Sequence, residues 1–98
     1  MEVSFDDKAL QRAYTDARAT VGHGHAIDRA FRKVVGIIRS AVDERDLYAL
    51  RGLAFERLKG NRSHQWSLRL NDQWRLIVEI RGQNPNKIIG IVSVEDYH

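Results

Sequence analysis

The 98-residue sequence contains no cysteine, only one proline and no long hydrophobic run. Without cysteine there is no disulfide framework, no iron–sulfur cluster, no cysteine nucleophile and no thiolate zinc site. A membrane-spanning helix needs about 20 consecutive apolar residues, and the N-terminus is acidic where a secretory signal is basic. We therefore expect a cytoplasmic protein that holds no metal and has no membrane partner.

Length and composition predict one domain over residues 1–98. Hydrophobic residues make up 43% of the chain, and a chain of this size buries roughly two-thirds of its unfolded surface on folding. No repeat, low-complexity segment or linker interrupts the sequence. The composition therefore supports one modest core.

The excess of positive charge is confined to the middle of the chain. The formal net charge is +3. Residues 51–75 carry six basic and two acidic side chains, a local net of +4, whereas residues 1–50 carry eight of each sign. Such a segment indicates an anionic partner.

The N-terminal half has the periodicity of helices after a short strand. Residues 3–5 alternate apolar and polar side chains, and the acidic pair at residues 6 and 7 can cap the helix that follows. Helical spacing continues to Val21, where two nearby glycines stop it. A second amphipathic helix is predicted over residues 27–42, continuing with a break to about Leu50.

From Leu53 onward the period of the apolar residues changes to 2, which predicts strands. Residues 66–70 and 74–80 form a hairpin, and residues 87–94 form a last strand after the turn at 81–86. The sequence therefore predicts an α+β fold. A short N-terminal strand and two helices pack on a four- to five-stranded, mainly antiparallel sheet.

The two tryptophans limit the register of the predicted hairpin to two possibilities. If Trp66 and Trp74 face the same core, either Leu70 pairs with Trp74 or the hairpin contains a one-residue bulge. In the first case Arg69 and Arg75 lie opposite each other on the other face. Like charges in that position destabilise the sheet, and an anion would offset the cost.

Basic side chains of the middle segment converge on that face and on the loop before it, as a single-stranded phosphate backbone requires. A solvated sheet face is the plain alternative, and the cross-strand arginine pair favours binding. The candidates are Lys59, Arg62, Arg69 and Arg75.

The C-terminal residues 95–98 (EDYH) bring carboxylates, a phenol and an imidazole together at the end of the last strand. Such groups can transfer protons without a metal. A frayed polar tail is the plain alternative.

Other aromatic and histidine residues are interpreted as structural. Trp66 and Trp74 alternate with polar neighbours, as core residues do. His23 and His25 belong to a loop between helices, because two imidazoles do not complete a metal site. His64 is a minor candidate in the loop before a strand.

Four motifs carry a resemblance to a known family: LKGNR at 58–62, QWSLRL at 65–70, QWRL at 73–76 and EDYH at 95–98. In order and spacing they resemble the HigB-type plasmid-maintenance killer toxins of the RelE/ParE superfamily. The resemblance covers residues 53–98, and the earlier part matches only as a pair of helices. It implies a RelE-like, microbial-RNase-like fold, a ribosome-dependent mRNA endonuclease and a helix-turn-helix antitoxin of the HigA type.

The resemblance also implies roles for particular residues. Lys59 and Arg75 would stabilise the phosphate, while the last three residues would supply the acid, the base and a base-stacking ring. Many relatives have a histidine two residues before Leu58, where this chain has Glu56, so Glu56 is a candidate base. The catalytic candidates are Glu56, Lys59, Arg75, Asp96, Tyr97 and His98, and the RNA-binding candidates are the four basic residues above together with Arg57.

The sequence hypothesis is a type II toxin that cleaves mRNA in the ribosomal A site without a metal or other cofactor. His98, Asp96 or Glu56 takes a proton from a ribose 2′-hydroxyl, and the products carry a 2′,3′-cyclic phosphate and a 5′-hydroxyl. The expected partners are the antitoxin, the ribosome and mRNA, with operator DNA reached only through the antitoxin. A ParE-like toxin that poisons DNA gyrase and a non-catalytic RNA- or ribosome-binding module are the alternatives, and the C-terminal motif favours the nuclease.

Overall fold

The computed structural model describes residues 1–97. Over this range three α-helices, two short 3₁₀ helices and one five-stranded sheet are present. The elements in chain order are β1 (Glu2–Phe5), α1 (Lys8–Thr15), α2 (His25–Ser40), α3 (Glu44–Ala49), η1 (Arg51–Leu53), β2 (Glu56–Arg57), η2 (Gly60–Arg62), β3 (Trp66–Arg69), β4 (Trp74–Arg81) and β5 (Ile88–Asp96).

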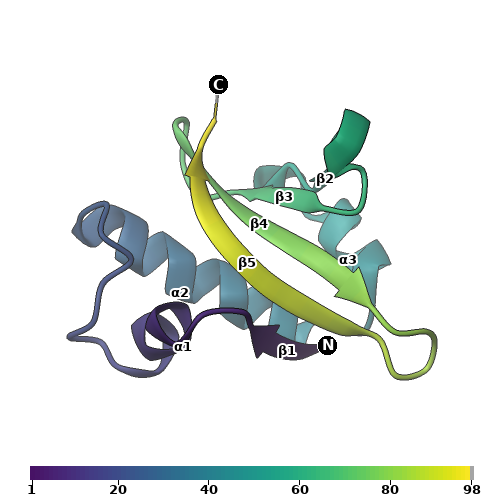
Figure 1. The fold of residues 1–98 in the computed structure, drawn as a ribbon, viewed down its shortest axis with the longest axis horizontal. Helices are drawn as coiled ribbons and strands as arrows, with labels where there is room; N and C mark the ends of the chain where they lie inside the picture. The colour runs from purple at the N-terminus through teal and green to yellow at the C-terminus, as the bar shows by residue number, and fades with distance from the viewer. Residues whose placement is uncertain (98) are drawn as a thin grey trace.

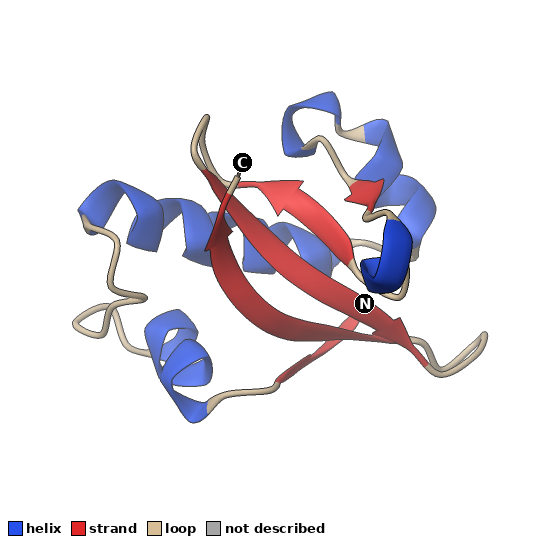
Figure 2. Cartoon of the chain, turned by 45° about the horizontal axis from the view of Figure 1, so that its top comes forward, coloured by secondary structure: helices blue, strands red, loops and turns tan. Residues whose placement is uncertain are grey.

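The sheet has the order β1-β5-β4-β3-β2. Its strands pair antiparallel except β1, which lies parallel to β5 at one edge. Figure 1 shows α2 running behind the sheet, and Figure 2 shows the same layering from a tilted view. The α+β prediction is therefore confirmed. We call the sheet surface opposite to α2 the open face.

The core lies between α2 and the covered side of the sheet. Its aliphatic and aromatic side chains repeat at helical spacing on α2 and on alternate positions of the strands, as the two periodicities require. Trp66 packs against this cluster, whereas Trp74 stacks on His23 with 3.8 Å between ring centroids. The buried residues are Ile27, Phe31, Val34, Val35 and Ile38 of α2 and Leu68, Leu76, Val78, Ile89 and Ile91 of the sheet.

The first helix is shorter than the sequence predicts. It ends at Thr15, and the following segment is held by Asp28 of α2 instead of continuing as a helix to Val21. The buried Asp28 carboxylate accepts hydrogen bonds from the Thr20 hydroxyl at 3.0 Å and from the Val21 amide at 2.9 Å. A buried carboxylate needs such donors, so tertiary pairing overrides the helical spacing. The predicted break in the second helical region is confirmed, since α2 ends at Ser40 and α3 begins at Glu44.

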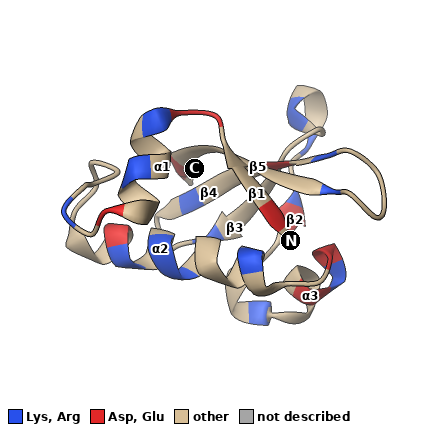
Figure 3. Ribbon diagram, turned by 90° about the horizontal axis from the view of Figure 1, so that it is seen from below, with Lys and Arg blue, Asp and Glu red and all other residues tan. Residues whose placement is uncertain are grey.

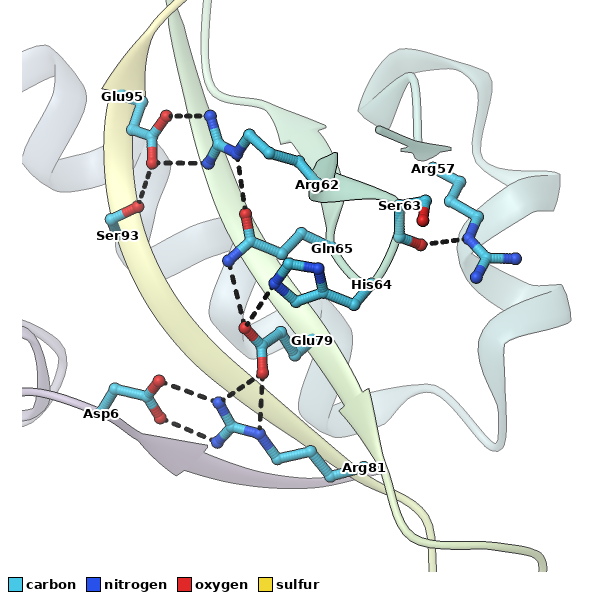
Figure 4. Close-up of polar contacts among 10 residues, drawn as sticks. All are labelled: Asp6, Arg57, Arg62, Ser63, His64, Gln65, Glu79, Arg81, Ser93 and Glu95. Atoms are coloured by element: carbon cyan, nitrogen blue, oxygen red, sulfur yellow. Dashed lines mark hydrogen bonds and ion pairs between the residues drawn. The ribbon is translucent and has the colours of Figure 1, made fainter. Parts of the chain in front are cut away.

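An arginine joins the end of β1 to the open face (Figure 4). Arg81 donates to both carboxylate oxygens of Asp6 at 2.8 and 2.9 Å and to Glu79 Oε1 at 3.0 Å. Its guanidinium lies against the backbone of Gly90, where any Cβ would overlap it. The hydrogen bond from Arg81 lowers the pKa of Asp6, and hydrogen bonds from Gln65 and then Arg81 lower the pKa of Glu79.

We predict that Arg81→Met lowers the free energy of unfolding by about 1 kcal/mol at neutral pH, the upper end for partly exposed pairs. Lowered carboxyl pKa values stabilise the folded state above the unfolded pKa of about 4, and this stabilisation is lost as pH falls through the folded pKa. The difference from wild type should therefore shrink in acid. Urea unfolding at several pH values measures it, with Arg29→Met on the exposed side of α2 as the control. An equal loss at every pH would contradict the ion-pair explanation.

Candidate nucleic-acid interface

Strand register sets which side chains share the open face. Directly opposed residues point to the same side of a sheet. One row across the strands contains Glu56, Ser67, Ile77 and Ser93, and the next row contains Arg69, Arg75 and Glu95. Three candidates, Glu56, Arg69 and Arg75, therefore gather on this surface.

The predicted hairpin register is confirmed. The Leu70 amide donates to the Trp74 carbonyl at 2.9 Å, and Arg69 lies directly opposite Arg75. The repulsion expected between the two arginines is offset within the chain. Arg69 pairs with Asp72 in the turn, and Arg75 has Glu95 as its opposite residue on β5.

Arg75 and Tyr97 form a stack at the end of the open face. The guanidinium carbon of Arg75 lies 4.1 Å from the centroid of the Tyr97 ring, a cation–π distance. The amide of Tyr97 donates to the Gln73 carbonyl at 2.6 Å, which holds the residue beside the hairpin turn. Half of Tyr97 is exposed, so the stack presents a cation and an aromatic surface to solvent.

Two buried polar atoms near this stack have no hydrogen-bond partner within residues 1–97. They are Arg75 Nε and Ser67 Oγ. Ser67 pairs with Ile77 and Arg75 pairs with Arg69, so Ser67 and Arg75 are diagonal neighbours on the open face. Both atoms therefore belong to the same region. Each is a donor, but both are buried, so an anionic oxygen could reach them only after the side chains that cover them move aside.

Arg62 reaches over the same face from η2. Its two Nη atoms each lie 2.9 Å from one oxygen of Glu95, and its Nε donates to Gln65 Oε1 at 2.9 Å. The Ser93 hydroxyl also donates to Glu95, at 2.7 Å. The hydrogen bond from Arg62 lowers the pKa of Glu95, and burial opposes that shift.

The Arg62 cluster continues along the sheet. Gln65 Nε2 donates to Glu79 Oε2 at 3.1 Å, and His64 Nε2 lies 3.8 Å from the same oxygen. Figure 4 shows this chain of contacts running from Ser93 to Asp6 across the open face. Sequence analysis assigned no role to Gln65 or Glu79, and it placed Glu95 in the C-terminal motif without naming a partner for it. The pairing of β4 with β5 was the signal that could have placed Glu95 opposite Arg75. The contact of Glu95 with Arg62 could not be predicted from a local pattern, because the two residues are 33 positions apart.

The remaining candidates do not share this arrangement. Arg57 is opposite Trp66, on the other side of β2 from Glu56, and its guanidinium lies 5.1 Å from the Trp66 ring centroid. Its Nε donates to the Ser63 carbonyl. Asp96 is opposite Trp74 and accepts from Gln73 Nε2 at 3.1 Å, so it lies on the covered side of the sheet.

Lys59 is exposed in the loop that leads to η2. His98 lies outside the described residues. Within residues 1–97, no three His, Cys, Asp or Glu side chains gather as metal ligands. No helix in the described range is long and apolar enough to cross a membrane.

Comparisons with known proteins agree with this fold. The family model described as the RelE-like toxin of type II toxin-antitoxin system HigB matches residues 3–98. Toxin HigB-1 of Vibrio cholerae serotype O1 is 34% identical over 79 residues, which cover 81% of this chain and 83% of that protein.

Solved structures share the architecture at low sequence identity. The YoeB/ParE toxin from Agrobacterium tumefaciens is 15% identical, with a TM-score of 0.57 and full coverage of both chains. The YoeB-YefM complex from Staphylococcus aureus is 20% identical, with a TM-score of 0.59 over 100% of this chain and 97% of that one. The resemblance seen in the motifs is therefore confirmed, and this chain belongs to the HigB-like family of RelE-like toxins of type II toxin-antitoxin systems.

Proposed function

We propose that this toxin is a ribosome-dependent endoribonuclease that inhibits translation by cutting mRNA. The observation that carries the proposal is the Arg75–Tyr97 stack on the open face, in which Arg75 Nε has no hydrogen-bond partner within residues 1–97. An arginine can bind a phosphate while an aromatic ring stacks on a base, and together they suit single-stranded RNA.

The proposed reaction needs no metal. A base removes the proton from a ribose 2′-hydroxyl, the 2′-oxygen attacks the adjacent phosphorus, and the 5′-oxygen leaves with a proton from an acid. The products are a 2′,3′-cyclic phosphate and a 5′-hydroxyl. Lys59 and Arg75 would stabilise the added negative charge on phosphorus. Glu56, Asp96 and His98 are the candidate acid and base.

The positions of these candidates favour different roles. Glu56 shares the open face with Arg75, so its carboxylate can approach RNA bound there. Asp96 starts from the opposite side of the sheet, at the last position of β5. A substrate that wraps the end of β5 would contact both. Arg62 and Arg69 would bind flanking phosphates, and Arg57 would act only at the edge of the surface.

An antitoxin is the proposed regulatory partner. The family is defined by toxin-antitoxin systems, and one structural neighbour is a toxin in complex with YefM. We propose a helix-turn-helix antitoxin of the HigA type, through which operator DNA would be bound. The +4 charge of residues 51–75 would attract an acidic surface of that partner.

We predict that replacing the true base reduces mRNA cleavage by about 10²- to 10⁴-fold and leaves RNA binding nearly unchanged. The variants are Glu56→Gln, Asp96→Asn and His98→Ala. Single-turnover cleavage of ribosome-bound mRNA, with mapping of the new ends, measures the effect. If every variant cuts at the wild-type rate, the proposed mechanism is wrong. Intact mRNA with damaged chromosomes would instead indicate gyrase poisoning.

We predict that Arg75→Ala slows cleavage by roughly 10²- to 10³-fold, the usual effect of removing one preorganised donor. Arg51→Ala is the matched control, because it removes the same charge from η1. The same ribosome assay compares the two variants, and thermal unfolding confirms that both fold. Equal effects of the two substitutions would show that only overall charge matters.

A further inference from the structure

Arg62 is already bound by a carboxylate in the way that it would bind a phosphate. Its two Nη atoms meet the two oxygens of Glu95 at 2.9 Å each. This parallel, bidentate arrangement is the geometry by which arginine binds either carboxylate or phosphate. Glu95 therefore occupies the side of the guanidinium that RNA would otherwise contact.

The Glu95 carboxylate is itself held in place. The Ser93 hydroxyl donates to it at 2.7 Å, and Arg75 is its opposite residue on β4. Arg62 is oriented from its other end by Gln65. The contact is thus part of a built polar cluster on the open face.

The ion pair remains open to exchange. The side chain of Arg62 is 42% exposed and that of Glu95 is 37% exposed. Pairs at this exposure stabilise a protein only slightly, because water and salt weaken the attraction. A phosphate that also engages neighbouring groups can therefore replace the carboxylate. A phosphate without such contacts meets an ion pair with no net charge, in which the Glu95 carboxylate repels it.

We propose that Glu95 competes with RNA for Arg62 and so weakens the binding of free RNA. Arg62 then contributes to binding only when an RNA phosphate displaces Glu95, which favours a strand held in the correct geometry by other contacts. The inference rests on the proposed function, since it assigns Glu95 as a specificity-determining residue of the same RNA surface.

The test compares Glu95→Gln with Glu2→Gln, which removes the same charge from an exposed position at the start of β1. The probe is a short single-stranded RNA with 2′-O-methyl groups, which block attack by the 2′-oxygen. Fluorescence anisotropy gives the affinity at several salt concentrations. We expect Glu95→Gln to bind about threefold to tenfold more tightly than Glu2→Gln at low salt. The plot of log affinity against log salt should steepen by about 0.7, the value for one additional phosphate contact on a single strand.

A second comparison assigns the gain to Arg62. In an Arg62→Ala background, Glu95→Gln should no longer raise the affinity beyond the effect of Glu2→Gln. If Glu95→Gln binds RNA no better than Glu2→Gln, or more weakly, while circular dichroism shows the native fold, the competition is disproved. Glu95 would then only position Arg62.

The outcome is separable from that of the nuclease proposal. If Glu95→Gln binds RNA more tightly but the wild-type protein does not cleave ribosome-bound mRNA, the nuclease proposal is overturned and the competition is supported. Cleavage by wild type with no gain for Glu95→Gln would do the reverse. Failure of every variant, Glu95→Gln included, to bind the oligonucleotide would overturn the competition and leave the ribosome-dependent nuclease standing.

Discussion

The backbone pairing of β4 with its two neighbours is the constraint on which the rest of the site depends. The Leu70–Trp74 hydrogen bond closes the hairpin, and this register places Arg69, Arg75 and Glu95 in one row. A shift by one residue would send Arg75 into the core and expose Leu76. Burial of the apolar side chains against α2 resists that shift. The hydrophobic pattern that folds the sheet therefore also fixes the positions of the charged side chains on its open face.

The positive charge of the middle segment is less available than its sum implies. Arg62 and Arg69 of this segment each contact a carboxylate, and those carboxylates come from β5 and from the hairpin turn. Figure 3 shows that Lys and Arg also lie on α1 and α2, away from the open face. The proposed affinity for RNA would thus depend on which ion pairs an incoming phosphate can replace. Net charge steers an anion towards the protein, but the internal pairs decide where it binds.

The sequence was sufficient for features that depend on local pattern. The alternation in residues 66–80 predicted the hairpin and limited its register to two possibilities, of which the one with the Arg69–Arg75 pair is present. The acidic pair at 6 and 7 contained the Asp7 cap of α1. It was insufficient where distant residues decide the outcome. The helical spacing of apolar residues continues to Val21, but α1 stops at Thr15 and the buried Asp28 binds the segment that follows. The two-residue strand β2 was too short to show an alternating pattern. The sequence therefore could not predict which face of the sheet Arg57 lies on.

Two hydrogen-bond donors on the open face have no partner within residues 1–97. They favour an anion-binding site there independently of the number of positive charges. A buried hydroxyl or guanidinium N–H without a partner reduces stability, yet both Ser67 Oγ and Arg75 Nε are in that state within residues 1–97. Ser67 is almost fully buried on the open face, and the chain could have placed an apolar residue there at no such cost. An anionic oxygen bound between these diagonal neighbours on β3 and β4 would satisfy both donors once the side chains that cover them move aside. Ser67 lies opposite Glu56 on β2, so RNA bound through Ser67 would lie within reach of a proton acceptor. A bound anion at this position would account for two buried donors that lack partners within residues 1–97, beside the buried Ile77.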